Sequence, residues 1–179
     1  KGTVEADRQL RLRTWNAQTL LELAHVDIAI TPTKWQRNQF PKKIQKDIQV
    51  IHEGIQWGYL SEIKENRNKK PDCVSSIDNC EIITYVSRGF EEYRGFPQAM
   101  KALAEVQKVR PQAQVLIAGN DITAYGPSRS DGRSWGTWAK EEAKLDPKRT
   151  HWLGPLQEME YHQLLAWSDV HLYLTVPFV

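Results

Sequence analysis

Two arginines stand six residues apart in the sequence, and a glycine follows each of them, as Arg88-Gly89 and Arg94-Gly95. A guanidinium group is planar, permanently charged and presents a fork of donors that fits phosphate and carboxylate oxygens. Glycine lacks a side chain, so it lets the backbone approach a ligand closely. These residue types at this spacing predict an anion site.

A structural interpretation of the two arginines stays open beside this one. Arg88 could form an ordinary salt bridge with Glu91 or Glu92, and Arg94 could be an exposed surface side chain. Surface ion pairs of this kind are common and contribute little to stability. The elements around the arginines therefore have to be considered.

The arginines fall between a predicted strand and a predicted helix. Residues 82–86 are β-branched and aromatic, which is typical of a buried strand, and Pro97 suits the first position of a helix over residues 97–109. Ligands of open α/β sheets bind at the carboxyl ends of strands, and a helix N-terminus adds positive potential there. The helix is expected to bury one apolar face. Its members are Ala99, Met100, Ala102, Leu103 and Val106.

The N-terminal third alternates helical and extended patterns. Apolar residues recur at helical spacing over residues 7–24, and short apolar runs at residues 26–31 and 48–52 predict strands. Between them, Thr33 is expected to cap a helix over residues 34–40, which Pro41 ends. This order indicates a layered α/β domain.

Residues 58–80 are polar and rich in charge, so we predict a linker or an exposed excursion there. In the charge run Lys64–Lys70, acidic residues alternate with basic ones, and aromatic residues do not interleave. The formal charge of the 179-residue chain is only +2. Both observations argue against nucleic acid as a partner.

The last third again alternates strands and helices. We expect strands at residues 115–119, 152–153 and 170–174, with a helix over residues 158–167. Residues 120–147 form a long excursion with one short helix over residues 137–145. Its tryptophans, Trp135 and Trp138, could stack on a base or sugar, or could anchor the loop to the core. The order of elements predicts a doubly wound parallel sheet.

Several other kinds of site find no support in the sequence. The glycine fingerprint of dinucleotide binding, the P-loop, the nucleophile elbow and the paired-histidine zinc motif are all absent. The five histidines are scattered, so no metal is expected, and His171 is interpreted as a satisfied core or near-core group. Cys73 and Cys80 match no zinc spacing and are expected to be free thiols, although a disulfide between them stays open. No apolar run has the length of a membrane span.

The arrangement Arg88-Gly89-x4-Arg94-Gly95 after a strand resembles the Gly-Arg to Lys-Gly motif of group 1 glycosyltransferases, with Arg94 in place of the usual lysine. The resemblance continues in order along the chain. Similar segments are residues 28–33 and 50–55 (end of the acceptor domain), 115–119 (second donor-domain strand), 151–156 (the Phe-Leu-Gly loop) and 167–170 (the Ala-Asp-Val turn).

The resemblance implies a Rossmann-like parallel sheet with flanking helices, as the truncated C-terminal (donor) domain of a GT-B fold. Residues 81–179 would form that donor domain, incomplete at its C-terminus. Residues 1–57 would be the tail of the acceptor domain and the crossover. The family's Glu-x7-Glu segment is missing, so catalytic residues are expected outside the chain, which we expect to be an inactive fragment.

The resemblance also implies a function, namely sugar transfer from a nucleotide diphosphate-sugar to an acceptor, with retention and without a metal or other cofactor. Arg88 and Arg94 would hold the donor diphosphate, supported by Gly89 and Gly95. The cleft would be lined by Gly119 and Asn120, and the nucleobase would lie beside Gly154, Pro155 and Leu156.

The acceptor, whether a glycan, a lipid or a small molecule, is not indicated. A cytoplasmic location is expected, and peripheral membrane association stays open. The alternatives are a non-catalytic nucleotide- or phosphate-binding α/β module, and a nucleotide-sugar epimerase or sugar-phosphate synthase of the same fold.

Overall fold

The computed structural model describes residues 5–54, 58–59, 61, 63 and 70–175. The chain divides into two compact units, Lys1–Ile55 and Gln56–Val179. No helix within the described ranges has the length and apolar character needed to cross a membrane.

In its described residues, the first unit combines three helices with a small parallel sheet. Strand β1 (Ala29–Thr31) pairs in parallel with β2 (Ile48–Val50), and helix α1 (Ala6–Leu23) precedes them. Thr33 caps helix α2 (Lys34–Arg37) as predicted, because its hydroxyl accepts a hydrogen bond from the Gln36 N–H. The helix predicted over residues 34–40 is shorter than expected. A second one-turn helix, α3 (Lys42–Gln45), follows Pro41, because proline and its predecessor disfavour an unbroken helix.

The second unit is built on a four-stranded parallel sheet with the strand order β5-β4-β3-β6. Its strands are β3 (Glu81–Gly89), β4 (Ala113–Asn120), β5 (Thr150–Gly154) and β6 (Val170–Leu172). Counted within the unit, the order is 3-2-1-4, so the chain reverses direction across the sheet between β3 and β6. This is the strand order of a Rossmann-like half, and the reversal marks a topological switch point.

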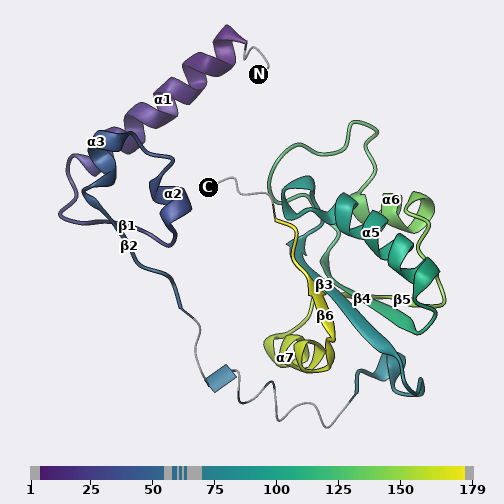
Figure 1. Cartoon of the computed structure of the whole chain (residues 1–179). Coiled ribbons are helices and arrows are strands. Elements are labelled where there is room, and N and C mark those ends of the chain that lie inside the picture. The colour runs from purple at the N-terminus through teal and green to yellow at the C-terminus, as the bar shows by residue number, and fades with distance from the viewer. Residues whose placement is uncertain (1–4, 55–57, 60, 62, 64–69, 176–179) are drawn as a thin grey trace. The chain divides into compact units, whose positions relative to one another are not determined.

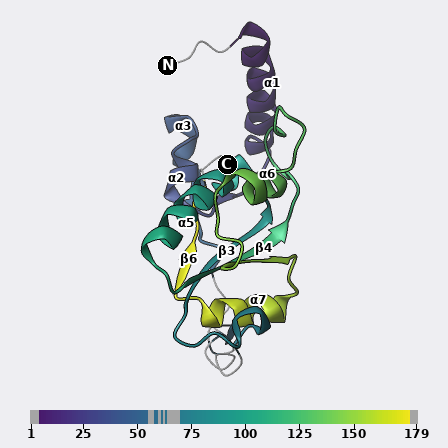
Figure 2. The same cartoon turned by 90° about the vertical axis from the view of Figure 1, so that its right-hand side faces the viewer.

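Helices cover both faces of this sheet (Figures 1 and 2). Helices α5 (Phe96–Val109) and α6 (Trp135–Glu142) lie on one face, and α7 (Glu158–Trp167) lies on the other. Ile83 and Tyr85 of β3 point to the α5 face, while Ile82 packs with Leu164 of α7. Both faces are buried, which explains the continuous apolar runs that predicted β3 and β4. On helix α5, Ala104 is buried instead of the expected Ala102.

The end of the predicted linker belongs to the folded core. Residues 72–74 form a one-turn 3₁₀-helix, and Val74 is completely buried with Leu116 and Leu164 under the α7 face. One apolar side chain in a polar stretch gives no periodic signal, so this packing was not predictable. Cys73 and Cys80 are free thiols, as expected.

The tryptophans of the long loop are structural anchors. Trp135 and Trp138 are buried in the main core, with ring centroids 5.4 Å apart in an edge-to-face arrangement. The interpretation that they stack on a base or sugar is therefore wrong. Helix α6 begins at Trp135, before the predicted start at residue 137, because the Ser134 hydroxyl caps it by accepting from the Thr137 N–H.

We expect the second unit to lose stability in mild acid because of two histidines. His151 lies 2.9 Å from the Gln114 amide oxygen, and His171 lies 2.9 Å from the Thr84 hydroxyl, which satisfies it although the residue is exposed. Partial desolvation of the two rings, which for His171 holds although the residue as a whole is exposed, lowers the pKa of both below the ordinary 6.5. The unfolded chain therefore binds protons first as the pH falls, and stability should drop as the pH falls through about 6.5 and below. Thermal melts of the wild type and of a His151→Gln/His171→Gln variant over a series of pH values test this, because the melting temperature of the variant should depend less on pH. An equal dependence of the melting temperature on pH in both proteins would show that these histidines do not cause the loss of stability.

Candidate anion-binding site

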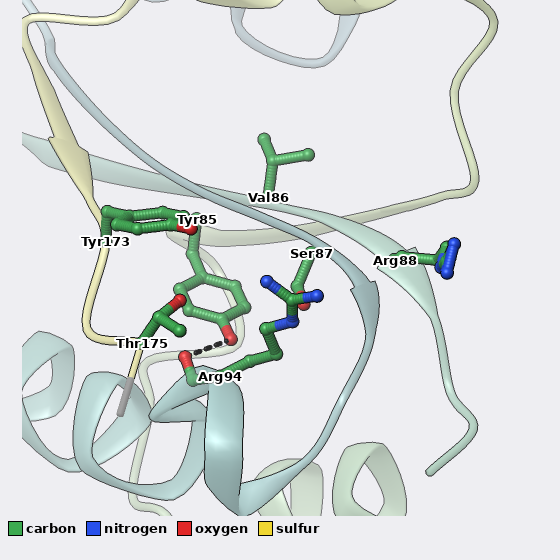
Figure 3. A pocket seen from close by; sticks show the side chains of 7 residues that line it. All are labelled: Tyr85, Val86, Ser87, Arg88, Arg94, Tyr173 and Thr175. Carbon is green, nitrogen blue, oxygen red and sulfur yellow. Dashed lines mark hydrogen bonds between the residues drawn. The ribbon is translucent and has the colours of Figure 1, made fainter. Parts of the chain in front are cut away.

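A pocket of about 340 Å³ lies at the switch point of the sheet (Figure 3). Its walls come from the ends of β3 and β6 and from the segment before α5. The lining residues are Tyr85, Val86, Ser87, Arg88, Arg94, Tyr173 and Thr175. Both arginines singled out from the sequence therefore line one pocket, at the place where open parallel sheets bind their ligands.

A second pocket of about 230 Å³ shares Val86, Ser87 and Arg88 with the first one. It extends across β4 toward the start of α7. Its other lining residues are Ala118, Gly119, Asn120, Pro155, Leu156 and Tyr161. The structure thus brings Arg88 together with four of the residues expected beside the cleft and base. Gly154 is not among the lining residues; it ends β5 with a φ of +69° just before them.

Arg94 is held on several sides. Its carbonyl oxygen accepts a hydrogen bond of 3.0 Å from the Tyr85 hydroxyl, and its Nε lies 3.6 Å from a carboxylate oxygen of Glu91. Burial raises the pKa of Tyr85 to about 12, so the hydroxyl stays a donor at neutral pH. Figure 3 shows the Arg94 side chain beside Ser87 within the pocket. Arg94 is therefore a partly buried, oriented cation, unlike the exposed side chain of the structural interpretation.

Arg88 is exposed and points away from Arg94 (Figure 3). Its guanidinium donates a hydrogen bond of 3.3 Å to the Tyr125 hydroxyl, which raises the pKa of Arg88. Within the described part of the chain, Glu91 forms its ion pair with Arg94 and not with Arg88. The two guanidinium groups share a pocket but do not converge, so joint contact with one anion requires Arg88 to change rotamer, which is fast for an exposed side chain.

The glycines serve the chain's own packing. A Cβ atom on Gly89 would lie 2.7 Å from the Ile122 carbonyl oxygen, and one on Gly95 would overlap the Leu174 backbone. A Cβ on Gly119 would overlap the Ser87 carbonyl oxygen. We expected Gly89 and Gly95 to allow close approach of a ligand, whereas the structure shows close approach of neighbouring backbone.

The start of helix α5 contributes its dipole to the site, but two of its first N–H groups are already used. The Gly95 N–H donates to the Glu92 carbonyl, and the Phe96 N–H donates to the Glu91 carbonyl. Pro97 has no N–H to offer. Direct contacts to an anion must therefore come mainly from side chains.

Sequence reasoning missed Glu91, Tyr125, Tyr161 and Tyr173 as members or supports of the site. Glu91 looks the same as its exposed neighbour Glu92 in the sequence, and Tyr125 lies in a stretch without periodicity. Tyr173 was predicted inside a strand over residues 170–174, whereas β6 ends at Leu172 and Tyr173 follows it. Within the described part of the chain, no group of three or more His, Cys, Asp or Glu side chains could hold a metal ion.

The strand order defines a Rossmann-like α/β unit, and the charged pocket is a candidate ligand site at its switch point. Residues 1–60 match the family model described as glycosyl transferase family 4 group. No curated protein matches the chain. The family match supports the group 1 glycosyltransferase resemblance and thus a transferase. It rests on residues 1–60, of which no described residue lines either pocket, so it is independent of the arginines.

Proposed function

We propose that the protein is a GT-B glycosyltransferase that takes a sugar from a nucleotide diphosphate-sugar, and that the second unit binds this donor. The observation that carries the proposal is the pair Arg88 and Arg94 lining one pocket at the switch point. The family match of residues 1–60 supports glycosyl transfer from a different part of the chain. Each argument stands without the other.

The proposed chemistry follows from where charge develops. Breaking the bond between sugar and diphosphate leaves negative charge on the phosphate oxygens, and oriented cations stabilise that charge. Arg94 is already oriented by Glu91, and Arg88 stands at the boundary of the two pockets. The pocket lined by Gly119, Asn120, Pro155 and Leu156 would then take the nucleoside, and the pocket beside Tyr173 the sugar side. Retention and independence of metal are part of the proposal through the family resemblance.

Titration of UDP, GDP and ADP into the protein by calorimetry tests the proposal. Arg88→Ala and Arg94→Ala should each weaken binding by about 1.5–3 kcal/mol, the size of one charge-assisted contact. Arg110→Ala is the matched control, because Arg110 pairs with Glu81 at the opposite end of β3. It should leave the affinity unchanged.

Equal affinity of the wild type and both site variants would rule out the diphosphate assignment. Binding without turnover, in a protein that also carries the catalytic residues expected outside this chain, would favour the second candidate, a non-catalytic nucleotide- or phosphate-binding module. That candidate uses the same pocket, so only turnover separates the two.

A further inference from the structure

Glu91 lies between the two arginines in the sequence, and its side chain is almost completely buried, with 1% of its surface exposed. One carboxylate oxygen, Oε2, accepts hydrogen bonds of 2.7 Å from the backbone N–H groups of both Ala124 and Tyr125. The other oxygen, Oε1, is buried without a hydrogen bond, and the Arg94 Nε lies 3.6 Å from it. Burying a carboxylate costs free energy unless hydrogen bonds or nearby charges compensate it. The two short, charge-assisted hydrogen bonds to Glu91 therefore hold the backbone of Ala124 and Tyr125 firmly.

The backbone that Glu91 holds belongs to a loop that fits closely against the arginine segment. Gly89 leaves just enough room for the Ile122 carbonyl, and the Tyr93 ring fills the space beside Gly126. These two contacts are steric, so they only limit how closely the loop approaches the arginine segment. The two hydrogen bonds to Glu91 are directional, so they fix the orientation of the loop at residues 124 and 125.

Tyr125 carries this orientation to the candidate site. Its hydroxyl accepts the hydrogen bond from Arg88, and the Arg88 guanidinium lies 5.9 Å from the centre of its ring. Arg88 in turn lines both pockets. We propose that Glu91 is a positioning residue that anchors residues 124–125 and, through Tyr125, places Arg88 at the boundary of the two pockets. This inference rests on the proposed anion site.

Charge and geometry have to be separated in any test. Removing the Glu91 carboxylate also removes a negative charge beside an anion site, which by itself strengthens anion binding. Glu91→Gln and Glu91→Ala remove the same charge. An amide oxygen can still accept both N–H groups, with the amide nitrogen turned toward Arg94, whereas alanine leaves them without an acceptor. The difference between the two variants therefore isolates the anchor.

The experiment measures the affinity for inorganic pyrophosphate by calorimetry, with hydrogen exchange of the segment containing Ala124 and Tyr125. Glu91→Ala should bind pyrophosphate about five- to tenfold more weakly than Glu91→Gln, as expected when one positioned contact is loosened. Exchange at residues 124–125 should be faster in the alanine variant. With Arg88→Ala added, the two variants should bind equally. Glu92→Ala and Glu92→Gln, at the exposed neighbour, are the controls and should not differ.

Tyr125→Phe provides a second route if Glu91→Ala fails to fold. It keeps the exposed ring and removes only the hydroxyl, so it should weaken pyrophosphate binding in the wild type and have no effect after Arg88→Ala. A general loss of stability would not depend on Arg88 in this way.

The outcomes separate this inference from the proposed function. If pyrophosphate binding is absent, or is insensitive to Arg88→Ala and Arg94→Ala, both fail. If binding depends on the arginines but Glu91→Ala equals Glu91→Gln, or Tyr125→Phe binds like the wild type, the positioning role of Glu91 is overturned and the anion site stands. A difference that persists after Arg88→Ala also overturns it.

Discussion

Alanine at Gly95 should destabilise the second unit far more than alanine at Gly154, although both glycines have nearly the same backbone conformation. Their φ angles are +65° and +69°, and both lie in the left-handed region that costs an L-residue about 1–2 kcal/mol. At Gly154 a Cβ would meet nothing within 4 Å. At Gly95 it would overlap the Leu174 backbone, which cannot rotate away as a side chain can.

The expected free-energy changes follow from these two contributions. Gly154→Ala should lose about 1–2 kcal/mol, and Gly95→Ala should lose about 2–5 kcal/mol, because overpacking adds about 1–3 kcal/mol to the same strain. Urea denaturation followed by tryptophan fluorescence measures both. The matched φ angles make Gly154→Ala the control for backbone strain. Equal losses at the two positions would show that the segment after β6 does not pack against Gly95.

The Gly95 contact also has a consequence for the site. It brings Leu174 against the start of α5, and the neighbours of Leu174, Tyr173 and Thr175, line the arginine pocket. Relieving the overlap by moving this segment would change the wall of that pocket. Gly95→Ala should therefore weaken nucleoside diphosphate binding as well.

The parts of the structure that could be predicted from the sequence are those with a regular hydrophobic pattern. Continuous apolar runs predicted β3 and β4, a 3.6-residue period predicted the apolar face of α5, and the order of these elements predicted the sheet and the edge at which a ligand is expected. The arginines were predictable because a strand end and a helix start locate them. Helix α7 was predicted at its observed bounds, Glu158–Trp167.

The support of the site could not be predicted, because it depends on contacts between segments far apart in the chain. Glu91 and Tyr125 meet across more than thirty residues of sequence. Gly89 and Gly95 were interpreted through the ligand, since a sequence does not show which backbone will approach a glycine. The direction of the Arg88 side chain depends on Tyr125 in the same way.

Phe96→Ala is the side-chain truncation that should cost the second unit most in stability. Phe96 is completely buried at the first position of α5, immediately after the arginine segment. Its ring stacks on Phe90 at a centroid distance of 4.4 Å and meets Tyr85 edge-on at 5.5 Å. Removing a buried phenylalanine costs about 3–5 kcal/mol, from lost transfer free energy and the cavity that remains.

The same substitution should reach the anion site through Tyr85. The Tyr85 hydroxyl holds the Arg94 carbonyl at 3.0 Å, and its ring loses an edge-on partner when Phe96 is removed. We therefore expect weaker nucleoside diphosphate binding at temperatures where the variant is still folded. Met159→Ala, which truncates a mostly exposed apolar side chain of α7, is the control and should lose little stability or affinity. A Phe96→Ala protein that is destabilised but binds with wild-type affinity would show that Arg94 is oriented by Glu91 and not by the aromatic core beneath it.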